Sequence, residues 1–153
     1  MEQDIQLMRL VRLADIEQNR LLRPRFVELG LTLGQGQPRI LNYLASHDGV
    51  TQRQLADACH IDAATISRTL DQLEKAGLLR RTQAPESRRA YLVVLTEQGR
   101  RIASQVQASF AQADQTACAG LSPAQRAALR QGLEEMLRSL RAAQALPGTD
   151  GSF

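Results

Sequence analysis

Arginine side chains are the groups in this sequence best placed to bind a charged partner. Arg88 and Arg89 precede the β-forming run YLVVL, and Arg80 and Arg81 lie on the segment before it. A guanidinium group stays charged at neutral pH and donates paired hydrogen bonds to phosphate oxygens. Between residues 51 and 101, nine Lys and Arg face six Asp and Glu, so this span holds the whole net charge of +3. The pattern indicates a partner that is a polyanion, although a solvated charged surface would give the same counts.

Groups suited to catalysis or to metal binding are few. Cys59 and His60 are adjacent, and adjacent residues at a helix end do not face each other as a nucleophile and its base must. Paired carboxylates, a phosphate-binding loop and metal-ligand spacing are all missing. Cys59 and Cys118 are too few and too far apart to predict a zinc site or a disulfide framework. We therefore expect no enzyme activity, no metal, no cofactor and a reducing, cytoplasmic location.

The composition predicts a helical protein with an aliphatic core. Aromatic residues make up 3% of the 153 residues, so Leu, Ile, Val and Ala must fill the interior. No apolar run approaches the ~18 residues of a membrane span. The first residues also lack the pattern of a signal peptide, so we expect no membrane association.

Two helices joined by a short turn come before the arginines. Thr51 and Gln54 form a capping box that opens a helix ending near Cys59. Asp62 is the expected N-cap of a second helix, which Gly77 ends in the left-handed conformation. About three residues separate the helices, which is helix-turn-helix spacing. We expect His60 to supply the positive φ of the turn, because His tolerates that region better than most residues other than glycine.

Two strands, 78–83 and 89–95, follow and are joined by the short polar loop APES. The order helix, turn, helix, hairpin is that of a winged helix-turn-helix, whose second helix enters the major groove of DNA. The predicted fold class is mainly α with a small β-hairpin wing (α+β), with helices added at both ends. The hairpin arginines favour DNA as the polyanion.

The second helix has two distinct faces. Ile66, Leu70 and Leu73 form an apolar stripe that must face the core. The opposite face is predicted to contact DNA and holds Ala63, Ala64, Thr65, Ser67, Arg68 and Asp71. Arg68 is one turn into the helix, where it can reach a guanine edge or a phosphate. Further contacts are expected from the wing, at Ser87, Arg88, Arg89 and Arg81, and to the DNA backbone from Thr51, Gln52 and Arg53. An alternative for Arg89 is an internal ion pair with a carboxylate such as Asp71.

Long helices are predicted on both sides of this module. The first runs from about residue 2 to 29, with a kink or break at Pro24, which lacks an N–H group. Pro38 suits the first turn of the next helix. Thr96 should cap a helix that ends near Gly120, and the run from Ser122 to Gln125 is a capping box that opens the last helix.

Four stretches together resemble the MarR family of bacterial transcription regulators. They are LGLT at 29–32, QRQLADACHID at 52–62, ISRTLDQLEKAGLLRR at 66–81 and SRRAYLVVLTEQG at 87–99. The similarity runs through the middle of the chain and both helical flanks. The family usually has Asp where this chain has Ser87, which puts one bracing contact of the wing in doubt.

The resemblance implies a homodimer that binds a palindromic operator, with half-sites about 34–36 Å apart. Residues 1–35 would be the N-terminal dimerisation helix and its connector, 36–98 the DNA-binding domain, 99–146 the C-terminal dimerisation helices and 147–153 a tail. Apolar stripes on the terminal helices support the dimer independently, although packing within one chain would also cover them. The residues expected at the dimer interface are Leu7, Leu10, Val11, Leu129, Leu133, Met136, Leu137 and Leu140.

The resemblance also implies a repressor that a small, phenolic or aromatic anion releases from DNA. The ligand would lie between the first helix, the segment around Tyr43 and the helix after Thr96. Two alternatives remain. One is a winged-helix module that binds an acidic protein partner without an operator. The other is a regulator that senses oxidants through cysteine, for which Cys59, expected in the core, and Cys118 are the only thiols.

Overall fold

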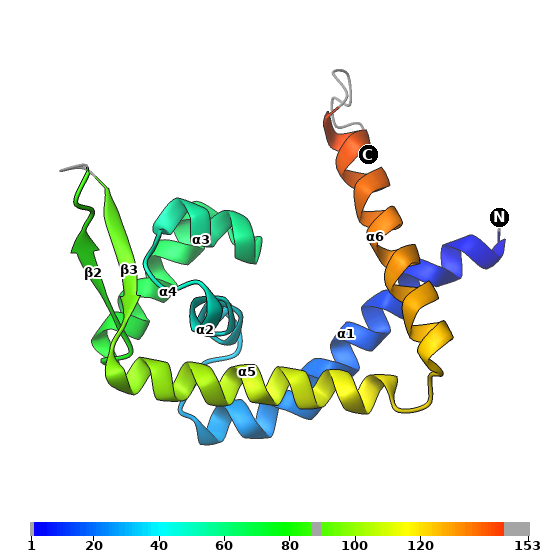
Figure 1. Cartoon of the computed structure of the whole chain (residues 1–153), viewed down its shortest axis with the longest axis horizontal. Coiled ribbons are helices and arrows are strands. Elements are labelled where there is room, and N and C mark those ends of the chain that lie inside the picture. Colours follow the sequence, from blue (N-terminus) through cyan, green and yellow to red (C-terminus); the bar gives the residue numbers. More distant parts are fainter. Residues whose placement is uncertain (1, 87–89, 146–153) are drawn as a thin grey trace. The chain divides into compact units, whose positions relative to one another are not determined.

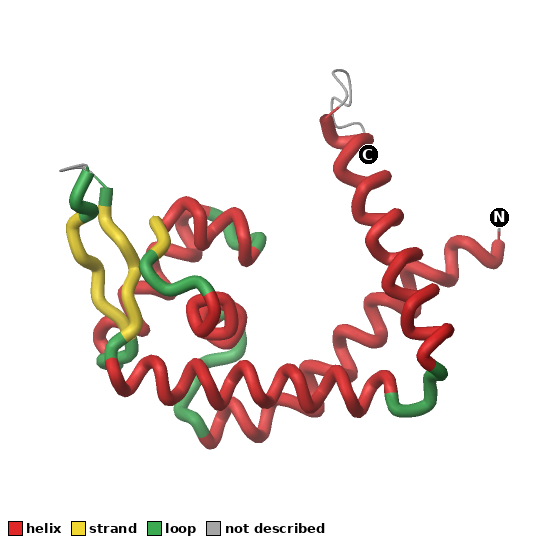
Figure 2. The backbone as a smooth tube through the Cα atoms, in the orientation of Figure 1, coloured by secondary structure: helices red, strands yellow, loops and turns green. Residues whose placement is uncertain are grey.

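The computed structural model describes residues 2–86 and 90–145, with side chains from residue 6 onward. The wing residues Ser87, Arg88 and Arg89, and the tail 147–153, therefore lie outside the described residues. The described chain forms six helices and three strands (Figures 1 and 2). In chain order they are α1 Glu2–Glu28, α2 Gln37–Ser46, β1 Val50–Thr51, α3 Gln52–Cys59, α4 Ala63–Lys75, β2 Leu79–Gln83, β3 Tyr91–Leu95, α5 Glu97–Cys118 and α6 Pro123–Ala145. The predicted fold class is confirmed.

The three strands form one antiparallel sheet in the order β1-β3-β2. Strands β2 and β3 pair from Leu79↔Leu95 to Gln83↔Tyr91 and make the predicted hairpin. Strand β1 was not predicted. It has two residues, which pair as Val50↔Val93 and Thr51↔Leu92, so β3 is the central strand. The start of α3 is therefore attached directly to the sheet.

The core lies where α2, α3 and α4 pack against the sheet. Ile40, Leu41 and Leu44 of α2 are buried, as the spacing predicts. The predicted inward stripe of α4 is confirmed as well, and Cys59 and Ile61 are buried on either side of the turn. Each large apolar side chain that leaves water contributes about 1.5–3 kcal/mol to folding. This shared core fixes how the two helices of the helix-turn-helix lie relative to the hairpin.

Helix α1 does not break at Pro24 but continues to Glu28. The prediction of a break was wrong because burial holds the helix on both sides of the proline. Leu22 and Phe26 are buried, and the ring of Phe26 packs against that of Phe110 in α5 with centroids 5.3 Å apart. These contacts offset the loss of one backbone hydrogen bond at the proline.

The chain divides into two compact units, Met1–Asp114 and Gln115–Phe153. The second unit contains the end of α5 and all of α6. Its capping box is present: Gln125 N–H donates to Ser122 Oγ at 3.1 Å, and Ser122 N–H donates to Gln125 Oε1 at 2.9 Å. Arg126 also donates to the carbonyl oxygen of Cys118 at 2.8 Å. No residue of α6 is buried. Within the part of the chain that is described, no helix combines the length and apolar character needed to cross a membrane.

Candidate nucleic-acid interface

The turn between α3 and α4 has the predicted geometry. His60 adopts the left-handed conformation, with φ 52° and ψ 47°. The N–H of Ile61 donates to the carbonyl oxygen of Ala56 at 3.0 Å, which closes the end of α3. The capping box of Thr51 and Gln54 starts the same helix. Local signals thus determine both ends of α3 and the direction in which the chain enters α4.

Asp62 fixes the first turn of α4. Its carboxylate accepts the Thr65 N–H at 2.8 Å and the Thr65 hydroxyl at 2.7 Å. These hydrogen bonds, with a smaller contribution from the charge of Arg68, lower the pKa of Asp62 below its ordinary value. The group therefore stays ionised at neutral pH and holds the N–H groups of the helix start in place.

The outer face of α4 carries the residues predicted to contact DNA. Ala63, Ala64 and Arg68 are exposed, while Thr65 and Ser67 are half-buried. The small alanine side chains let the helix backbone approach a groove closely. Among the residues that the structure describes, the guanidinium of Arg68 has no hydrogen-bond partner, so its donors are available to a ligand. Asp71 is also exposed but is bonded to Arg81.

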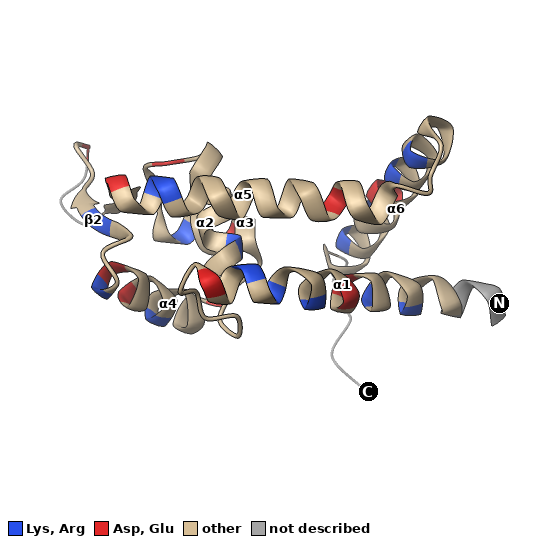
Figure 3. Cartoon of the chain, turned by 90° about the horizontal axis from the view of Figure 1, so that it is seen from below, with Lys and Arg blue, Asp and Glu red and all other residues tan. Residues whose placement is uncertain are grey.

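Arg81 connects strand β2 to α4 and is not a free cation on the wing. Its Nη1 lies 2.7 Å from Asp71 Oδ1 and 3.2 Å from Glu74 Oε2, and its Nη2 donates to the Ser67 carbonyl oxygen at 3.3 Å. Its side chain is only 23% exposed, so these contacts are screened less than surface ion pairs. Asp71, considered above as a partner for Arg89, is thus engaged by Arg81. Acidic and basic residues both lie on α4, while the charged residues of β2 are basic (Figure 3).

The predicted backbone contacts lie at the start of α3. The hydroxyl of Thr51 accepts the Gln54 N–H, and Thr51 is also paired with Leu92 in the sheet. Thr51 and Gln52 are half-buried, and Arg53 is exposed. Of the three, only Arg53 is exposed and could reach a phosphate, while Thr51 caps the helix.

The hairpin joins α5 through a tight set of hydrogen bonds. Thr96 donates its N–H to the Leu78 carbonyl oxygen at 3.1 Å and its hydroxyl to the Gly77 carbonyl oxygen at 2.6 Å. The same hydroxyl oxygen accepts the Gly99 N–H at 3.0 Å, which confirms Thr96 as the cap of α5. The ends of α4, the hairpin and α5 are therefore held at one point. We call α3, α4 and the β2–β3 hairpin, fixed in this way, the reading head.

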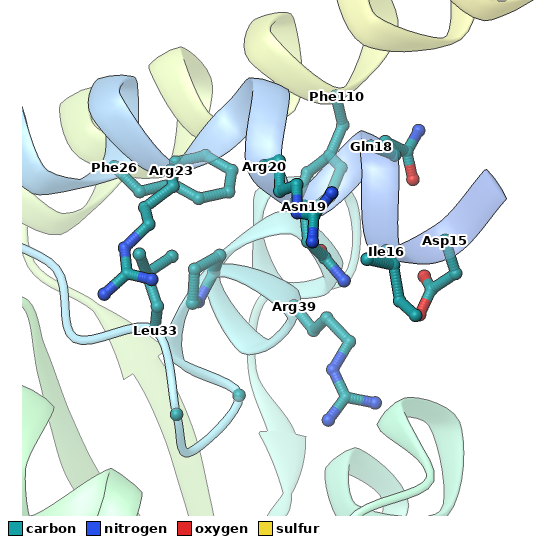
Figure 4. A pocket seen from close by; sticks show the side chains of 13 residues that line it. Asp15, Ile16, Gln18, Asn19, Arg20, Arg23, Phe26, Leu33, Arg39 and Phe110 are labelled. Atoms are coloured by element: carbon teal, nitrogen blue, oxygen red, sulfur yellow. The ribbon is translucent and has the colours of Figure 1, made fainter. Parts of the chain in front are cut away.

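A cleft of about 720 Å³ lies outside the reading head. Its walls are α1, the loop before α2 and Phe110 of α5 (Figure 4). Three arginines, Arg20, Arg23 and Arg39, and one carboxylate, Asp15, line it together with the Phe26–Phe110 ring pair. Arg20 is also bonded to Glu17 at 2.8 Å. The cleft thus combines positive charge with aromatic surface.

The sequence predicted only some of the segments that line this cleft. Helices α1 and α5 do line the cleft, but Tyr43 does not, and its ring stacks on His47 with centroids 4.3 Å apart. The loop 33–36 and Arg39 were missed, because their place in the cleft depends on how α1 packs across the start of α2. The spacing of Arg20 and Arg23 on one face of α1 was the available signal.

Burial makes Cys59 a poor redox centre. It is 7% exposed, and burial raises the pKa of its thiol, against a smaller opposite effect of Arg39. A neutral thiol is a weak nucleophile, so oxidant sensing through Cys59 is disfavoured. Within the described ranges 2–86 and 90–145, no group of three His, Cys, Asp or Glu residues is arranged to hold a metal ion.

Comparison with known sequences identifies regulators. The sequence model of the MarR family matches residues 29–90, which include α2, α3, α4 and β2. A protein of Thauera aromatica, named as a transcriptional regulatory protein for the hcr operon, is 31% identical over 99 residues. That match covers 65% of this chain and 60% of the relative's length, so the chain spans less than two thirds of this curated relative.

Solved structures of regulators share the fold. The structure of the transcriptional regulator SlyA superimposes with a TM-score of 0.80 at 22% identity, covering 88% of this chain and 93% of that one. A cysteine-to-serine variant of MarR from E. coli, complexed with operator DNA, gives a TM-score of 0.76 at 26% identity. That comparison covers 88% of this chain and 96% of the E. coli chain. The relatives are transcriptional regulators, as predicted, and not enzymes.

Proposed function

Because this chain belongs to the MarR family of transcriptional regulators, we propose that it is a repressor that binds a palindromic operator as a homodimer. We further propose that a small aromatic anion releases it from DNA. As a regulator of this bacterial family, it would act in the cytoplasm, where the DNA is.

The observation that carries operator binding is the exposed face of α4. Ala63, Ala64 and Arg68 are exposed on a helix whose opposite face is buried and whose start is capped by Asp62. The contacts of α4 with strand β2, and of the segment after α4 with α5, hold this face in a fixed orientation. A similar fold in complex with operator DNA supports the docking of α4 in the major groove.

Exposed apolar side chains on the long helices support the homodimer. On α1, Leu7, Leu10 and Val11 are 51%, 60% and 37% exposed. On α6, Leu129, Leu137 and Leu140 are each 49% exposed, and Leu133 and Met136 are half-buried. A second copy of the chain would cover these residues. We accordingly assign 1–35 and 99–146 to dimerisation and 36–98 to DNA binding.

The chemistry of the cleft supports an aromatic anion as the effector. Its three arginines outnumber its one carboxylate, so an anion is favoured over a cation. Phe110, which is half-buried and packs on the buried ring of Phe26, provides ring surface against which an aromatic group can pack. The volume of about 720 Å³ lies within the ordinary range for small-molecule sites.

The first experiment is footprinting on the DNA beside the protein's own gene, followed by titration of the protected site. Arg68→Ala should weaken binding by about 1–3 kcal/mol per half-site and relax the sequence preference, since Arg68 is exposed and its guanidinium has no hydrogen-bond partner among the described residues. Arg130→Ala is the matched control, because it removes the same charge from α6. It should bind the operator like the parent.

Raising the salt concentration provides an independent test. If phosphate contacts dominate, the logarithm of the binding constant should fall linearly with the logarithm of the salt concentration. Protein that retains no duplex DNA at low salt, or Arg68→Ala that binds the operator like the parent, would contradict the proposal. The first result would favour the protein-interaction alternative.

A further inference from the structure

One short loop borders both the cleft and the reading head. It comprises residues 33–36, which follow α1, and the first residues of α2, 37–39. Leu33, Gly34, Gly36, Pro38 and Arg39 all line the cleft. Of these, Arg39 also contacts the end of α3 and Gly36 also contacts Ile61, while their neighbours Gln35 and Gln37 bond to α4. We call residues 33–39 the cleft loop.

Two hydrogen bonds connect the cleft loop to α4. The hydroxyl of Thr69 donates to the Gln35 carbonyl oxygen at 2.9 Å, and Thr69 is fully buried. The side-chain amide of Gln37 donates to Gln72 Oε1 at 3.2 Å, and Gln37 is buried too. Thr69 lies on the buried side of α4, whereas Gln72 is exposed. The position of the loop and that of α4 are thus linked.

Gly36 packs directly against the turn of the helix-turn-helix. Its φ is +81°, and a Cβ atom at this position would lie 2.5 Å from Ile61 Cδ1. Ile61 directly follows His60, the residue with positive φ. The loop therefore touches the turn as well as α4, with no space between them for another side chain.

Arg39 makes the most direct connection. Its Nη1 donates to the Cys59 carbonyl oxygen at 2.9 Å, and so provides a donor for the last turn of α3. In return, the thiol of Cys59 contacts the Arg39 carbonyl oxygen at 3.8 Å. Figure 4 shows the guanidinium of Arg39 turned away from the Phe26–Phe110 pair. Its side chain nevertheless lines the cleft, so the guanidinium can bind either the Cys59 carbonyl oxygen or a molecule in the cleft.

We propose that Arg39 couples the cleft to the reading head by exchanging the Cys59 carbonyl oxygen for the carboxylate of a bound aromatic acid. This inference rests on the proposed function. A carboxylate adds the attraction of an opposite charge to the hydrogen bond from a guanidinium, which a neutral carbonyl oxygen does not provide. Arg23, on the opposite wall, supplies a second positive charge for the same carboxylate. When Arg39 turns toward the ligand, the end of α3 loses its donor.

The carbonyl oxygen that loses its donor lies at the junction of α3 with the turn. The Cys59 carbonyl group directly precedes His60, whose left-handed conformation sets the angle between α3 and α4. The cleft loop moves with Arg39 and carries the contacts to Thr69 and Ile61. The ligand-bound state therefore holds α4 less firmly, and its affinity for DNA is lower. By linkage, the operator must weaken ligand binding by the same factor.

The test uses benzoate as the probe, with benzyl alcohol as its neutral counterpart. Operator affinity is measured with and without saturating benzoate for the parent, Arg39→Ala and the control Arg23→Ala. For the parent, benzoate should weaken operator binding by about fivefold or more, and benzyl alcohol should have no effect. Arg39→Ala should bind the operator more weakly even without benzoate, and benzoate should change its affinity by less than about twofold.

Arg23→Ala should separate ligand affinity from coupling. It should require more benzoate but should reach the same loss of operator affinity at saturation, because its Arg39–Cys59 contact is intact. Arg39→Lys, which keeps a charged donor, should restore part of the response. The proposal fails if Arg39→Ala binds the operator like the parent and is released by benzoate to the same extent.

A second measurement does not depend on operator binding. Hydrogen exchange of the Ile61 N–H, which is bonded to Ala56, reports on the turn in the free protein. Benzoate should speed this exchange in the parent and leave it unchanged in Arg39→Ala. Equal acceleration in both proteins, or none in the parent, would overturn the coupling role of Arg39. A parent that binds no DNA but shows the expected exchange would refute the proposed function alone.

Discussion

Gly99 allows the first turn of α5 to cross the end of α4 at very short range. A Cβ atom at this position would lie 1.7 Å from the Leu78 carbonyl oxygen. Three residues earlier in the same junction, Thr96 uses both its N–H and its hydroxyl to bind the Gly77–Leu78 backbone. The sequence Leu-Thr-Glu-Gln-Gly at 95–99 thus encodes a junction, in which the threonine makes the contacts and the glycine leaves the space.

We predict that Gly99→Ala destabilises the protein by at least about 2 kcal/mol, since backbone atoms of the Leu78 segment must move to admit the methyl group. Denaturant unfolding at a fixed protein concentration measures the change. Gly120→Ala is the control, because no atom lies within 4 Å of its expected Cβ. Its free energy of unfolding should stay within about 1 kcal/mol of the parent value. Similar losses for both variants would contradict the role of the close contact.

At the scale of elements, Arg81 holds strand β2 against α4. Its guanidinium spans two carboxylates of α4 and the carbonyl oxygen of Ser67. Sequence reasoning gave Arg81 a direct contact with DNA. The observed contacts indicate a positioning role, in which Arg81 sets the distance between the wing and the recognition helix. The two interpretations differ in what they predict for Asp71.

We predict that Asp71→Asn weakens operator binding by about threefold or more, because it removes one anchor of Arg81. A direct contact predicts the opposite result, since the substitution removes a negative charge beside DNA and frees Arg81 for phosphate. Titration of the operator at two salt concentrations measures the effect. Asp57→Asn, an exposed carboxylate on α3, is the control for loss of charge. Tighter binding by Asp71→Asn than by this control would refute the positioning role.

Local signals explain which features the sequence could predict. The caps at Thr51, Asp62 and Thr96, and the positive φ of His60, depend on residues within a few positions of one another. Contacts between distant segments were missed. Strand β1 has only two residues, and the partners of Arg81 lie seven and ten positions away in the chain. The cleft depends on α1 lying near Arg39, which no local pattern encodes. Spacing within one element is visible in a sequence, whereas packing between elements is not.

At the scale of the whole molecule, the feature that bears on assembly is the exposed apolar surface of α1 and α6. None of the residues of α6 is buried, although Leu129, Leu133, Met136, Leu137 and Leu140 share one side of the helix. The N-terminal half of α1 is exposed as well and carries Leu7, Leu10 and Val11. Apolar surface on this scale marks an interaction site.

We predict that Leu137→Glu converts the dimer to a monomer, since it places a charge in a desolvated interface. Analytical ultracentrifugation measures the change. Operator affinity should fall by at least about 100-fold, because a monomer engages a single half-site and loses the gain from paired binding. Gln131→Glu, on the opposite side of α6, is the control and should remain dimeric. A parent protein that is monomeric at micromolar concentration would contradict the assembly itself.

Because β3 is the central strand, insertions near its two ends should have different effects on folding. Its inner end is fixed by β1, by Asp48, which accepts the Leu95 N–H at 2.9 Å, and by Thr96. Insertions at the 47–51 segment would therefore disturb the helices. The opposite end of the ladder closes at Gln83↔Tyr91, with one further bond from Ala84 to Ala90. The described ladder therefore ends at this bond, and length changes between Ala84 and Ala90 would leave the pairing of β1, β2 and β3 intact.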